Sequence, residues 1–434
     1  MGVVFWSILS NYIVIKNENK IKGSYYTPSS KSHSFRALLL SLQFSNSIIY
    51  NLLKSDDVDN FVDIIKSLGF IVIENNNELK LKKPHNIVIK EHYDFKNSGT
   101  ALRFMVTYLS LLNDSKKEVL LDGDKQLKNR KIKELLLSLE KLGLEYKFKT
   151  KKEIPFYINN KIKHGTTRVS GKSSQFLSSL LLNLSFADGK SIVYIDELNE
   201  KPYIDMTLYH LRRIGGVVDN LNYKKMIIHP VKKVDYFEYS VPGDFSSATF
   251  LILSSVLSKG ELDISNLDVD DTQGDKKILE YIRLLGCNYT ISNNGALKIS
   301  GDVNTSASFD MNDTPDMLPA LVFFLAQYPY SYQFTNLESI RFKETDRVKV
   351  LYDNLINMGI NAVLLNDKLS FTGKALITSP VINAMNDHRI IMAASLLGMK
   401  KGSSVKIYNI ENLSSSYPDY FSDIKKVGFT VEYF

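Results

Sequence analysis

The chain contains 434 residues, of which 44% are hydrophobic and 11% aromatic, and its formal net charge is +7. Because this length exceeds the usual size of one hydrophobic core and the apolar content excludes general disorder, two packed domains are expected. The apolar runs are too short to span a membrane, and the single cysteine, Cys287, excludes a disulfide framework and fits a reducing cytoplasm.

The basic residues and the histidines limit the possible partners. The 54 basic residues are dispersed along the chain, which argues against a polybasic arm for nucleic acid and is compatible with small anionic ligands. The seven histidines show no metal-ligand spacing, and one cysteine is too few for a structural zinc site. We therefore expect neither a metal nor another cofactor.

In chain order, the first predicted element is an N-terminal strand. The opening "MGVVFWSIL" (1–9) has no basic residue ahead of it and no clear cleavage site, so it is interpreted as a buried strand and not as a signal peptide. Six apolar helices follow, each preceded by Ser, Asn, Asp or Thr, whose side-chain oxygens can accept the first free backbone N–H groups. These segments are 30–40, 97–106, 173–182, 244–253, 313–322 and 386–397.

A second landmark keeps phase with these helices. Glycine follows a helix-like segment about every 70 residues, at Gly69, Gly143, Gly215, Gly286, Gly359 and Gly428. Glycine just past a helix commonly adopts a left-handed cap, so each one predicts a helix end before a strand, and Asn-rich pairs predict hairpin returns. The chain is thus predicted to contain six helix–helix–strand–strand units in a 3+3 arrangement, with a boundary near residues 241–243.

One stretch is unusually rich in charge. "IRFKETDRVKVL" (340–351) places five charged residues of both signs within seven positions. Taken alone, this pattern is compatible with the solvated first turn of a helix, with Lys343 and Arg347 on one face. Helix starts with free N–H groups attract anions, so if the six starts meet at one cleft, the ligand is expected to be strongly negative.

Nine motifs occur along the chain: "SKSHSFRALLL", "NSGTALR", "SSQFLSSLLL", "KPYIDMTL", "GDFSSATF", "PDM", "KETDR", "NDHR" and "SYPDYF". Over nearly the whole chain, this ordered set resembles the EPSP synthase family, the 3-phosphoshikimate 1-carboxyvinyltransferases. The resemblance implies an α/β fold of the inside-out α/β barrel type, with two domains of three βαβαββ units each. Residues 30–241 would form the N-terminal domain, and residues 1–29 with 242–434 the C-terminal domain.

The resemblance also implies the reaction. The enolpyruvyl group of phosphoenolpyruvate would be transferred to the 5-hydroxyl of shikimate 3-phosphate, with release of phosphate, by addition and elimination without a metal. Two phosphates and two carboxylates in one cleft require several cations and backbone donors, and the proton transfers require positioned acids and bases. A cytoplasmic monomer that binds these two substrates, and neither nucleic acid nor a membrane, is expected.

Four residues resemble the family's catalytic groups by their positions in the motifs. Lys31 would contact phosphoenolpyruvate and assist catalysis, and Asp316 would take the proton of the 5-hydroxyl. Glu344 would donate or accept a proton, and His388 would complete this end of the site. A structural interpretation stays open for Asp316 and His388, because an acid or a histidine at a helix start can simply stabilise the helix.

The other matched positions are implied as substrate ligands or their supports, although Ser32, Asn97 and Ser173 could equally be helix caps. Shikimate 3-phosphate would be bound by Ser32, Arg36, Ser173, Ser174 and Lys343, with Tyr203 beside its ring. Phosphoenolpyruvate would be bound by Arg347, and Gln175 would lie between the two substrates. A cradle and its support would be formed by Asn97, Gly99 and Arg103, and Arg389 would lie beside His388.

Four positions of the implied site depart from the family pattern. Gln126 and Ser415 stand where an arginine and a lysine for phosphoenolpyruvate are expected. Glu200 and Ser339 stand where a serine and an asparagine usually lie. Each lost charged hydrogen bond costs about 1.5–3 kcal/mol, so we predict weak binding of phosphoenolpyruvate with an intact acid–base set.

Three other functions stay open at the level of the sequence. The sister enolpyruvyl transferase that acts on UDP-N-acetylglucosamine shares the fold but typically depends on a loop cysteine, whereas Cys287 directly follows a helix. A catalytically decayed member that binds a small anion is compatible with the four departures. A nucleic-acid binder is suggested only by the net charge, and the chain lacks interleaved aromatic and basic residues.

Overall fold

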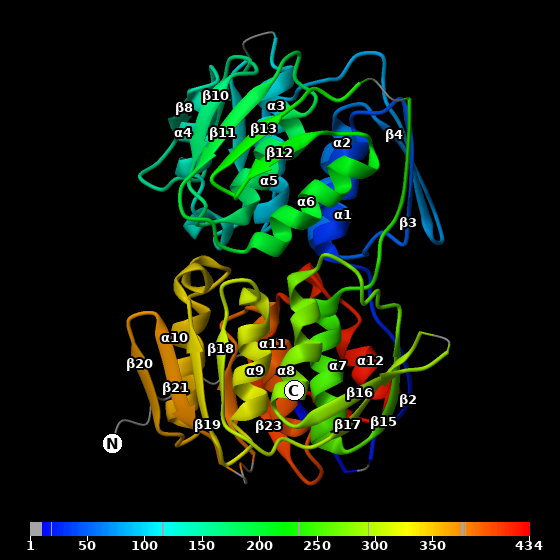
Figure 1. Ribbon diagram of the computed structural model, residues 1–434, viewed down its shortest axis with the longest axis vertical. Coiled ribbons are helices and arrows are strands. Elements are labelled where there is room, and N and C mark those ends of the chain that lie inside the picture. Colours follow the sequence, from blue (N-terminus) through cyan, green and yellow to red (C-terminus); the bar gives the residue numbers. More distant parts are fainter. Residues whose placement is uncertain are drawn as a thin grey trace. The chain divides into compact units, whose positions relative to one another are not determined.

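The computed structural model describes residues 11–18, 20–114, 117–232, 235–293, 295–374, 377 and 379–434. The strand predicted for residues 1–9 lies outside these ranges. The chain forms two compact units (Figure 1): unit 1 comprises Met1–Pro28, Phe245–Leu267 and Lys277–Phe434, and unit 2 comprises Ser29–Asp244 and Asp268–Lys276. The sequence assigned residues 268–276 to the C-terminal domain, whereas in the structure they pack with unit 2.

In the described part of unit 2, three sheets of four strands lie around the helices (Figure 1). Given in the order of hydrogen-bonded neighbours, the first sheet contains β14 (Tyr236–Ser240), β3 (Asn46–Tyr50), β5 (Glu78–Lys82) and β4 (Ile71–Asn75). The second contains β6 (His92–Asp94), β7 (Val119–Asp122), β9 (Phe156–Asn159) and β8 (Glu145–Phe148). The third contains β10 (Thr166–Val169), β11 (Ser191–Ile195), β13 (Lys225–Ile228) and β12 (Val218–Leu221). The helices are α1 (Lys31–Ser41), α2 (Asp56–Ser67), α3 (Gly99–Leu112), α4 (Lys133–Glu140), α5 (Ser174–Leu184) and α6 (Lys201–Arg213), with the 3₁₀ turn η1 (Leu127–Asn129).

Unit 1 has the same construction within its described residues. Its sheets are β16 (Cys287–Ile291), β17 (Leu297–Gly301), β15 (Glu261–Ser265), β2 (Lys22–Tyr26); β18 (Ala307–Asp310), β19 (Ser331–Thr335), β21 (Lys368–Thr372), β20 (Ala362–Leu365); and β22 (Val381–Asn383), β23 (Ser404–Tyr408), β1 (Tyr12–Lys16), β24 (Thr430–Tyr433). The helices are α7 (Phe245–Ser258), α8 (Ile278–Leu284), α9 (Leu318–Leu325), α10 (Arg347–Asn357), α11 (His388–Ser395) and α12 (Tyr420–Lys426), and the 3₁₀ turns are η3 (Pro315–Met317), η4 (Glu338–Phe342), η5 (Leu396–Gly398) and η6 (Leu413–Ser415). A further 3₁₀ turn, η2 (Gly274–Lys277), lies at the end of the segment 268–276 that packs with unit 2.

One connection pattern recurs in the sheets and explains the sequence repeat. In the sheet β10-β11-β13-β12, the parallel strands β10 and β11 are joined through α5, and β12 and β13 form an antiparallel hairpin beside β11. Parallel strands need a long crossover, whereas a hairpin needs only a turn. All six predicted glycines have positive φ values, between 70° and 112°, as a left-handed helix cap requires. The predicted α/β fold built from six βαβαββ units is therefore confirmed.

Strands from distant parts of the chain complete three of the sheets. β1 lies between β23 and β24 and is antiparallel to both, and β2 is parallel to β15. In unit 2, β14 is parallel to β3. The N-terminal strands β1 and β2 are thus paired with strands of the C-terminal half of the chain.

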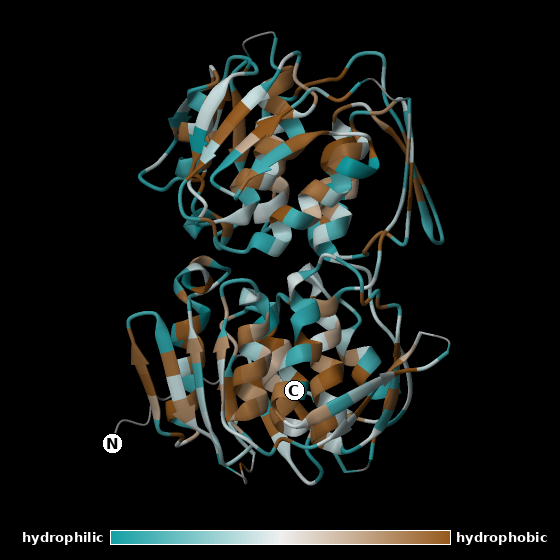
Figure 2. Ribbon diagram, in the orientation of Figure 1, coloured by the Kyte–Doolittle hydropathy of each residue, from teal (hydrophilic) through white to brown (hydrophobic). Residues whose placement is uncertain are grey.

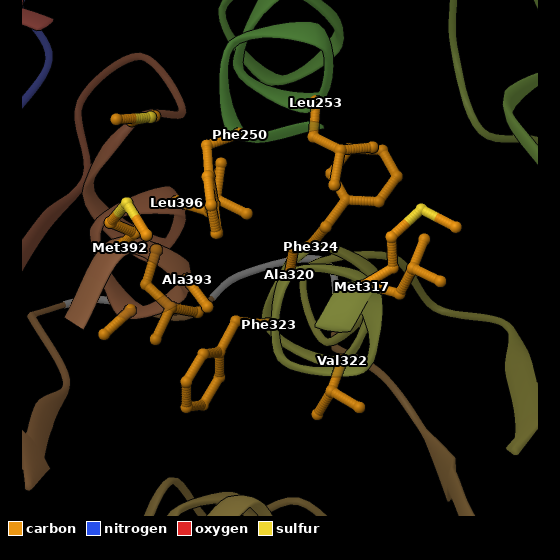
Figure 3. Packing of buried hydrophobic residues seen from close by; sticks show 14 of the residues in the cluster. Phe250, Leu253, Met317, Ala320, Val322, Phe323, Phe324, Met392, Ala393 and Leu396 are labelled. Carbon is orange, nitrogen blue, oxygen red and sulfur yellow. The ribbon is translucent and has the colours of Figure 1, made fainter. Parts of the chain in front are cut away.

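The core of unit 1 is centred on α7, α9 and α11. Figure 3 shows Phe250 and Leu253 packed near Phe324, Met392 and Leu396, and each of these side chains is at most 1% exposed. Burying a side chain of this size stabilises a fold by about 1.5–3 kcal/mol. The hydrophobic colouring is concentrated on the inner helices in both units (Figure 2). These packed helices hold their own polar starts in fixed positions.

Candidate functional site

In unit 1, charged side chains from three segments meet around Arg347, whose side chain is 1% exposed. Its Nε donates to Asp387 Oδ2 at 2.8 Å, its Nη1 to Asp316 Oδ1 at 2.8 Å, and its Nη2 to Glu344 Oε2 at 2.6 Å. Burial alone would lower the pKa of Arg347, but the three carboxylates raise it. Arg347 therefore carries its charge at any working pH, and among the described residues two of its five N–H donors are left for a ligand.

Three cations lie around Asp316. Besides Arg347, Lys343 Nζ and Arg389 Nη2 each lie 3.9 Å from its oxygens. Burial alone would raise the pKa of Asp316, but Lys343, Arg389 and Arg347 together hold it well below its usual range. The group is therefore ionised near neutral pH and can only accept hydrogen bonds.

The charged stretch 340–351 differs from the helix start that the sequence suggested. Arg341 lies in η4, Lys343 and Glu344 lie in the turn after it, and Arg347 is the first residue of α10. The reason is Asp346, whose side chain caps α10 by accepting from the backbone N–H of Lys349 at 3.0 Å. The turn before the cap allows Glu344 to fold back onto Arg347.

His388 and Ser415 lie together at the edge of this cluster. His388 is the first residue of α11, and its Nδ1 lies 3.3 Å from the Oγ of Ser415 in η6. Ser415 also donates to the backbone carbonyl of Asn412 at 3.0 Å. The capping residue of α11 is Asp387, which accepts from the N–H of Arg389 at 2.9 Å. His388 and Arg389 are both buried, each 5% exposed.

In unit 2, Arg36 joins three helices through hydrogen bonds to neutral groups. It donates to Thr207 Oγ1 and to the carbonyls of Ser32 and Tyr203 at 2.9 Å each, and to Ser178 Oγ at 3.2 Å. These partners lie on α1, α5 and α6. Burial lowers the pKa of Arg36 to about 10, so it is still a cation near neutral pH.

A second arginine joins α3 to α5. Arg103 donates to Gln175 Oε1 at 2.5 Å and to the carbonyl of Lys131 at 2.8 Å, and Gln175 donates to Thr100 Oγ1 at 3.1 Å. A Cβ at Gly99 would lie 2.6 Å from an Nη1 atom of Arg130, so glycine is needed for this guanidinium to approach the start of α3. Arg130 is 8% exposed, which places a buried cation at this helix start.

Lys31, the predicted catalytic lysine, is the first residue of α1. Its Nζ lies 2.5 Å from Asp57 Oδ2 in α2, and both side chains are largely buried. This acidic partner fixes the direction in which the long side chain of Lys31 points. Asp57 therefore positions the side chain of Lys31.

Two of the departures from the family pattern have defined partners in unit 2. Glu200 Oε2 accepts from Ser174 Oγ at 2.6 Å. Asn97 donates from Nδ2 to Gln126 Oε1 at 2.7 Å, so Gln126 lies beside the start of α3. The cap of α3 is Ser98 and not Asn97, because Ser98 Oγ accepts from the N–H of Ala101.

The remaining predicted positions are placed by the backbone. Ser32 lies in the first turn of α1 and Ser173 at the cap position of α5, both partly buried, and Tyr203 lies in the first turn of α6. Ser339 lies in η4 of unit 1 and is also partly buried. Three of these positions therefore belong to unit 2, and Ser339 belongs to unit 1.

Three residues of these clusters were missed by the sequence analysis. Asp387 was part of the "NDHR" motif but had no assigned role, and it lies fully buried against Arg347. Asp57 and Arg130 reach Lys31 and Gly99 from segments 26 and 31 positions away (57 − 31 = 26 and 130 − 99 = 31). Asp387 could have been predicted because it lies within a motif, whereas the contacts of Asp57 with Lys31 and of Arg130 with Gly99 depend on tertiary packing.

Two further observations apply to the described residues. Among them, no group of three or more His, Cys, Asp or Glu side chains is arranged to hold a metal ion. No helix within those ranges combines the length and the apolar character that crossing a bilayer requires.

Comparison with known proteins gives one consistent family. Residues 15–424 match the family model described as EPSP synthase (3-phosphoshikimate 1-carboxyvinyltransferase). The 3-phosphoshikimate 1-carboxyvinyltransferase of Archaeoglobus fulgidus is 31% identical over 422 residues, which cover 96% of this chain and 99% of the relative. The protein of the same name from Methanosarcina mazei is 32% identical over 428 residues, which cover 96% and 98%.

A solved structure agrees at the level of the fold. The EPSP synthase of Acinetobacter baumannii is similar with a TM-score of 0.81 and 20% sequence identity, covering 98% of this chain and 100% of the other. At this identity the likeness concerns the path of the backbone.

Proposed function

The chain belongs to the EPSP synthase family, and we propose that it transfers the enolpyruvyl group of phosphoenolpyruvate to the 5-hydroxyl of shikimate 3-phosphate, with release of phosphate. The observation that best supports this activity is the cluster around Arg347. It combines two carboxylates that can handle protons, Asp316 and Glu344, with two further cations, Lys343 and Arg389. Joining two anionic substrates while moving protons needs both kinds of group.

In the proposed mechanism, the proton transfers fall to the two carboxylates. The 5-oxygen of shikimate 3-phosphate attacks C2 of phosphoenolpyruvate as Asp316 accepts its proton, and C3 gains a proton from the side of Glu344 or Lys31. The tetrahedral intermediate then loses phosphate as C3 gives up a proton, which restores the double bond. Because its pKa is held low, Asp316 is ionised near neutral pH and can accept a hydrogen bond from the 5-hydroxyl; as a weak base it takes the proton only as the new C–O bond forms.

We assign the binding of the anionic groups to both clusters. Ser32, Ser173, Ser174 and Lys343 would bind shikimate 3-phosphate, supported by Arg36, with Tyr203 beside the ring. Arg347, three of whose N–H groups bond to carboxylates of the described residues, would use the other two for the carboxylate of phosphoenolpyruvate, with Gln175 between the substrates. The cradle of Asn97, Gly99 and Arg103, together with Arg389 and His388, completes the proposed ligand set.

Phosphoenolpyruvate is proposed to bind weakly. Gln126 is held by Asn97 and Ser415 by His388, and neither supplies a formal cation. Arg130 at the start of α3 offsets part of this loss. Lys128, which could have replaced the missing cation, pairs with Asp122 at 3.0 Å. A Michaelis constant for phosphoenolpyruvate in the usual range of the family would contradict this part of the proposal.

The decisive experiment is phosphate release with both substrates, measured against each substrate alone. Release only with both supports the transfer reaction, and Asp316→Asn should slow it by about 10²–10⁴-fold. A decayed family member would bind shikimate 3-phosphate in calorimetry without release. Release with UDP-N-acetylglucosamine instead would favour the sister enzyme, although Cys287 is 1% exposed at the start of β16, which does not suit a loop cysteine.

The proposal also covers the oligomeric state, the cellular compartment and the partners of the protein. We expect a monomer in the cytoplasm that binds neither nucleic acid nor membranes. Light scattering after size exclusion tests the oligomeric state. Steep salt-dependent retention on an oligonucleotide column would contradict the exclusion of nucleic acid.

A further inference from the structure

The start of α5 already holds an anion supplied by the chain itself. Glu200 Oε2 accepts from Ser174 Oγ at 2.6 Å and lies 3.4 Å from the backbone nitrogen of Ser174. Glu200 is 4% exposed, so its carboxylate points inward. The first N–H groups of a helix have no partner inside the helix and attract negative charge. The Glu200 carboxylate therefore occupies the position at which this helix would hold an external anion.

The local backbone shows that Glu200 is turned inward by a specific conformation. It has φ 58° and ψ 43°, a left-handed geometry that is uncommon for a residue other than glycine, just before α6. The residue at the usual capping position, Ser173, makes no capping hydrogen bond to the described residues. Glu200, which follows Ser174 by 26 positions, thus serves the donors of α5 in place of the local cap.

We propose that Glu200 is a built-in competitor for the phosphate of shikimate 3-phosphate and sets the affinity for that substrate. The proposal rests on the proposed function, which assigns that phosphate to Ser173 and Ser174. A carboxylate and a phosphate cannot share the same donors, because two like charges at hydrogen-bonding distance repel each other strongly. The Glu200 side chain must leave Ser174 before the phosphate can bind.

The test compares Glu200→Gln and Glu200→Asn with the wild-type enzyme. Gln keeps the size and removes the charge, and Asn is smaller and tolerates the left-handed backbone, so that one variant remains if the other does not fold. The control is Glu197→Gln, which removes the same charge from an exposed side chain in the same loop. Calorimetry measures binding of shikimate 3-phosphate and of inorganic phosphate, and steady-state kinetics measure the Michaelis constants of both substrates.

Both Glu200 variants should bind shikimate 3-phosphate at least about tenfold more tightly, since no carboxylate then competes with the phosphate for the donors of Ser174. The Michaelis constant for this substrate should fall to the same degree, that for phosphoenolpyruvate should change less than about twofold, and Glu197→Gln should behave as wild type. Unchanged or weaker binding together with a lower melting temperature would make Glu200 a structural cap only and overturn the proposal.

Binding of inorganic phosphate tests the role of Glu200 without requiring that the protein catalyse the transfer reaction. If the Glu200 variants gain affinity for inorganic phosphate while no form releases phosphate from the two substrates, the internal competitor is supported and the proposed function fails. If wild type turns over both substrates but the variants gain no affinity for either phosphate ligand, the proposed function stands and the internal competitor is wrong.

Discussion

Two buried arginines, one in each unit, show how differently the two clusters treat positive charge. Arg347 in unit 1 is 1% exposed and faces three carboxylates, which raise its pKa. Arg36 in unit 2 is 3% exposed and donates to neutral oxygens, and burial lowers its pKa to about 10. The charge of Arg347 is neutralised by carboxylates of the same unit, whereas Arg36 donates to neutral oxygens and lies over the ring of Phe104, 5.8 Å from its centroid. The first arrangement sets protonation states, and the second leaves positive potential for an anionic ligand.

The largest effect is expected from removing the charge at Arg347. Arg347→Met would leave Asp316, Glu344 and Asp387 without their shared cation in a buried setting. Breaking a buried ion pair from one side costs about 3–5 kcal/mol, so the free energy of unfolding should fall by this amount and turnover should be lost. Urea unfolding followed by circular dichroism measures the change.

The control for this variant lies on the same helix. Lys349 forms an exposed pair with Asp353 at 2.7 Å, and Lys349→Met should change the free energy of unfolding by less than about 1 kcal/mol. Equal effects of the two substitutions would show that the three carboxylates do not depend on Arg347.

Asp316→Asn tests the protonation state that unit 1 imposes. Loss of a positioned general base reduces kcat by about 10²–10⁴-fold. The pKa of Asp316 is held low in the folded enzyme, so its ionised form stabilises the fold above the unfolded value of about 4, and this contribution is lost as the pH falls through the folded pKa.

This assignment predicts a specific pH dependence. Between pH 5 and 8 the difference in unfolding free energy between wild type and Asp316→Asn should stay constant, and below pH 4 it should shrink. A difference that does not change below pH 4 would mean that Asp316 has an ordinary pKa, and wild type gaining stability relative to the variant between pH 7 and 5 would mean a raised one; unit 1 would then not neutralise its charges in the way described.

Arg36→Met is expected to have a smaller effect on stability than Arg347→Met, because it leaves neutral oxygens and not carboxylates unpaired. We expect a loss of about 1.5–3 kcal/mol, together with about tenfold weaker binding of shikimate 3-phosphate. The exposed Arg168, paired with Asp196 at 2.7 Å, gives the matched control Arg168→Met, which should leave both quantities nearly unchanged. Binding that survives Arg36→Met would remove this arginine from the proposed phosphate site.

The sequence predicted the parts of both clusters that depend on local structure. Each of the six glycines follows a helix with positive φ, because a left-handed cap is a property of a few neighbouring residues. The six apolar helices with polar starts were predicted for the same reason. Lys31, Asp316 and Glu344 were proposed from their motifs, and the structure places Asp316 and Glu344 on one guanidinium.

The parts that escaped prediction depend on contacts between distant segments. The sequence showed that Glu200 replaces a serine, but not that its carboxylate turns inward onto Ser174. Likewise, the loss of an arginine at Gln126 was visible, whereas the buried guanidinium of Arg130 beside Gly99 was not. The assignment of residues 268–276 to unit 2 follows from buried contacts such as that between His33 Nε2 and Asp271 Oδ1 at 3.1 Å.

The smallest expected effect comes from restoring a cation to unit 2. Gln126→Arg places a guanidinium where Asn97 now donates to an amide oxygen. Since one charged hydrogen bond is gained and one neutral bond is lost, the Michaelis constant for phosphoenolpyruvate should fall about tenfold with little change in kcat. Asn76→Arg adds the same charge at an exposed turn and should leave the constant unchanged. If Gln126→Arg has no effect, Arg130 already supplies the positive charge at the start of α3. The arginine expected at position 126 would then not be needed for phosphoenolpyruvate binding.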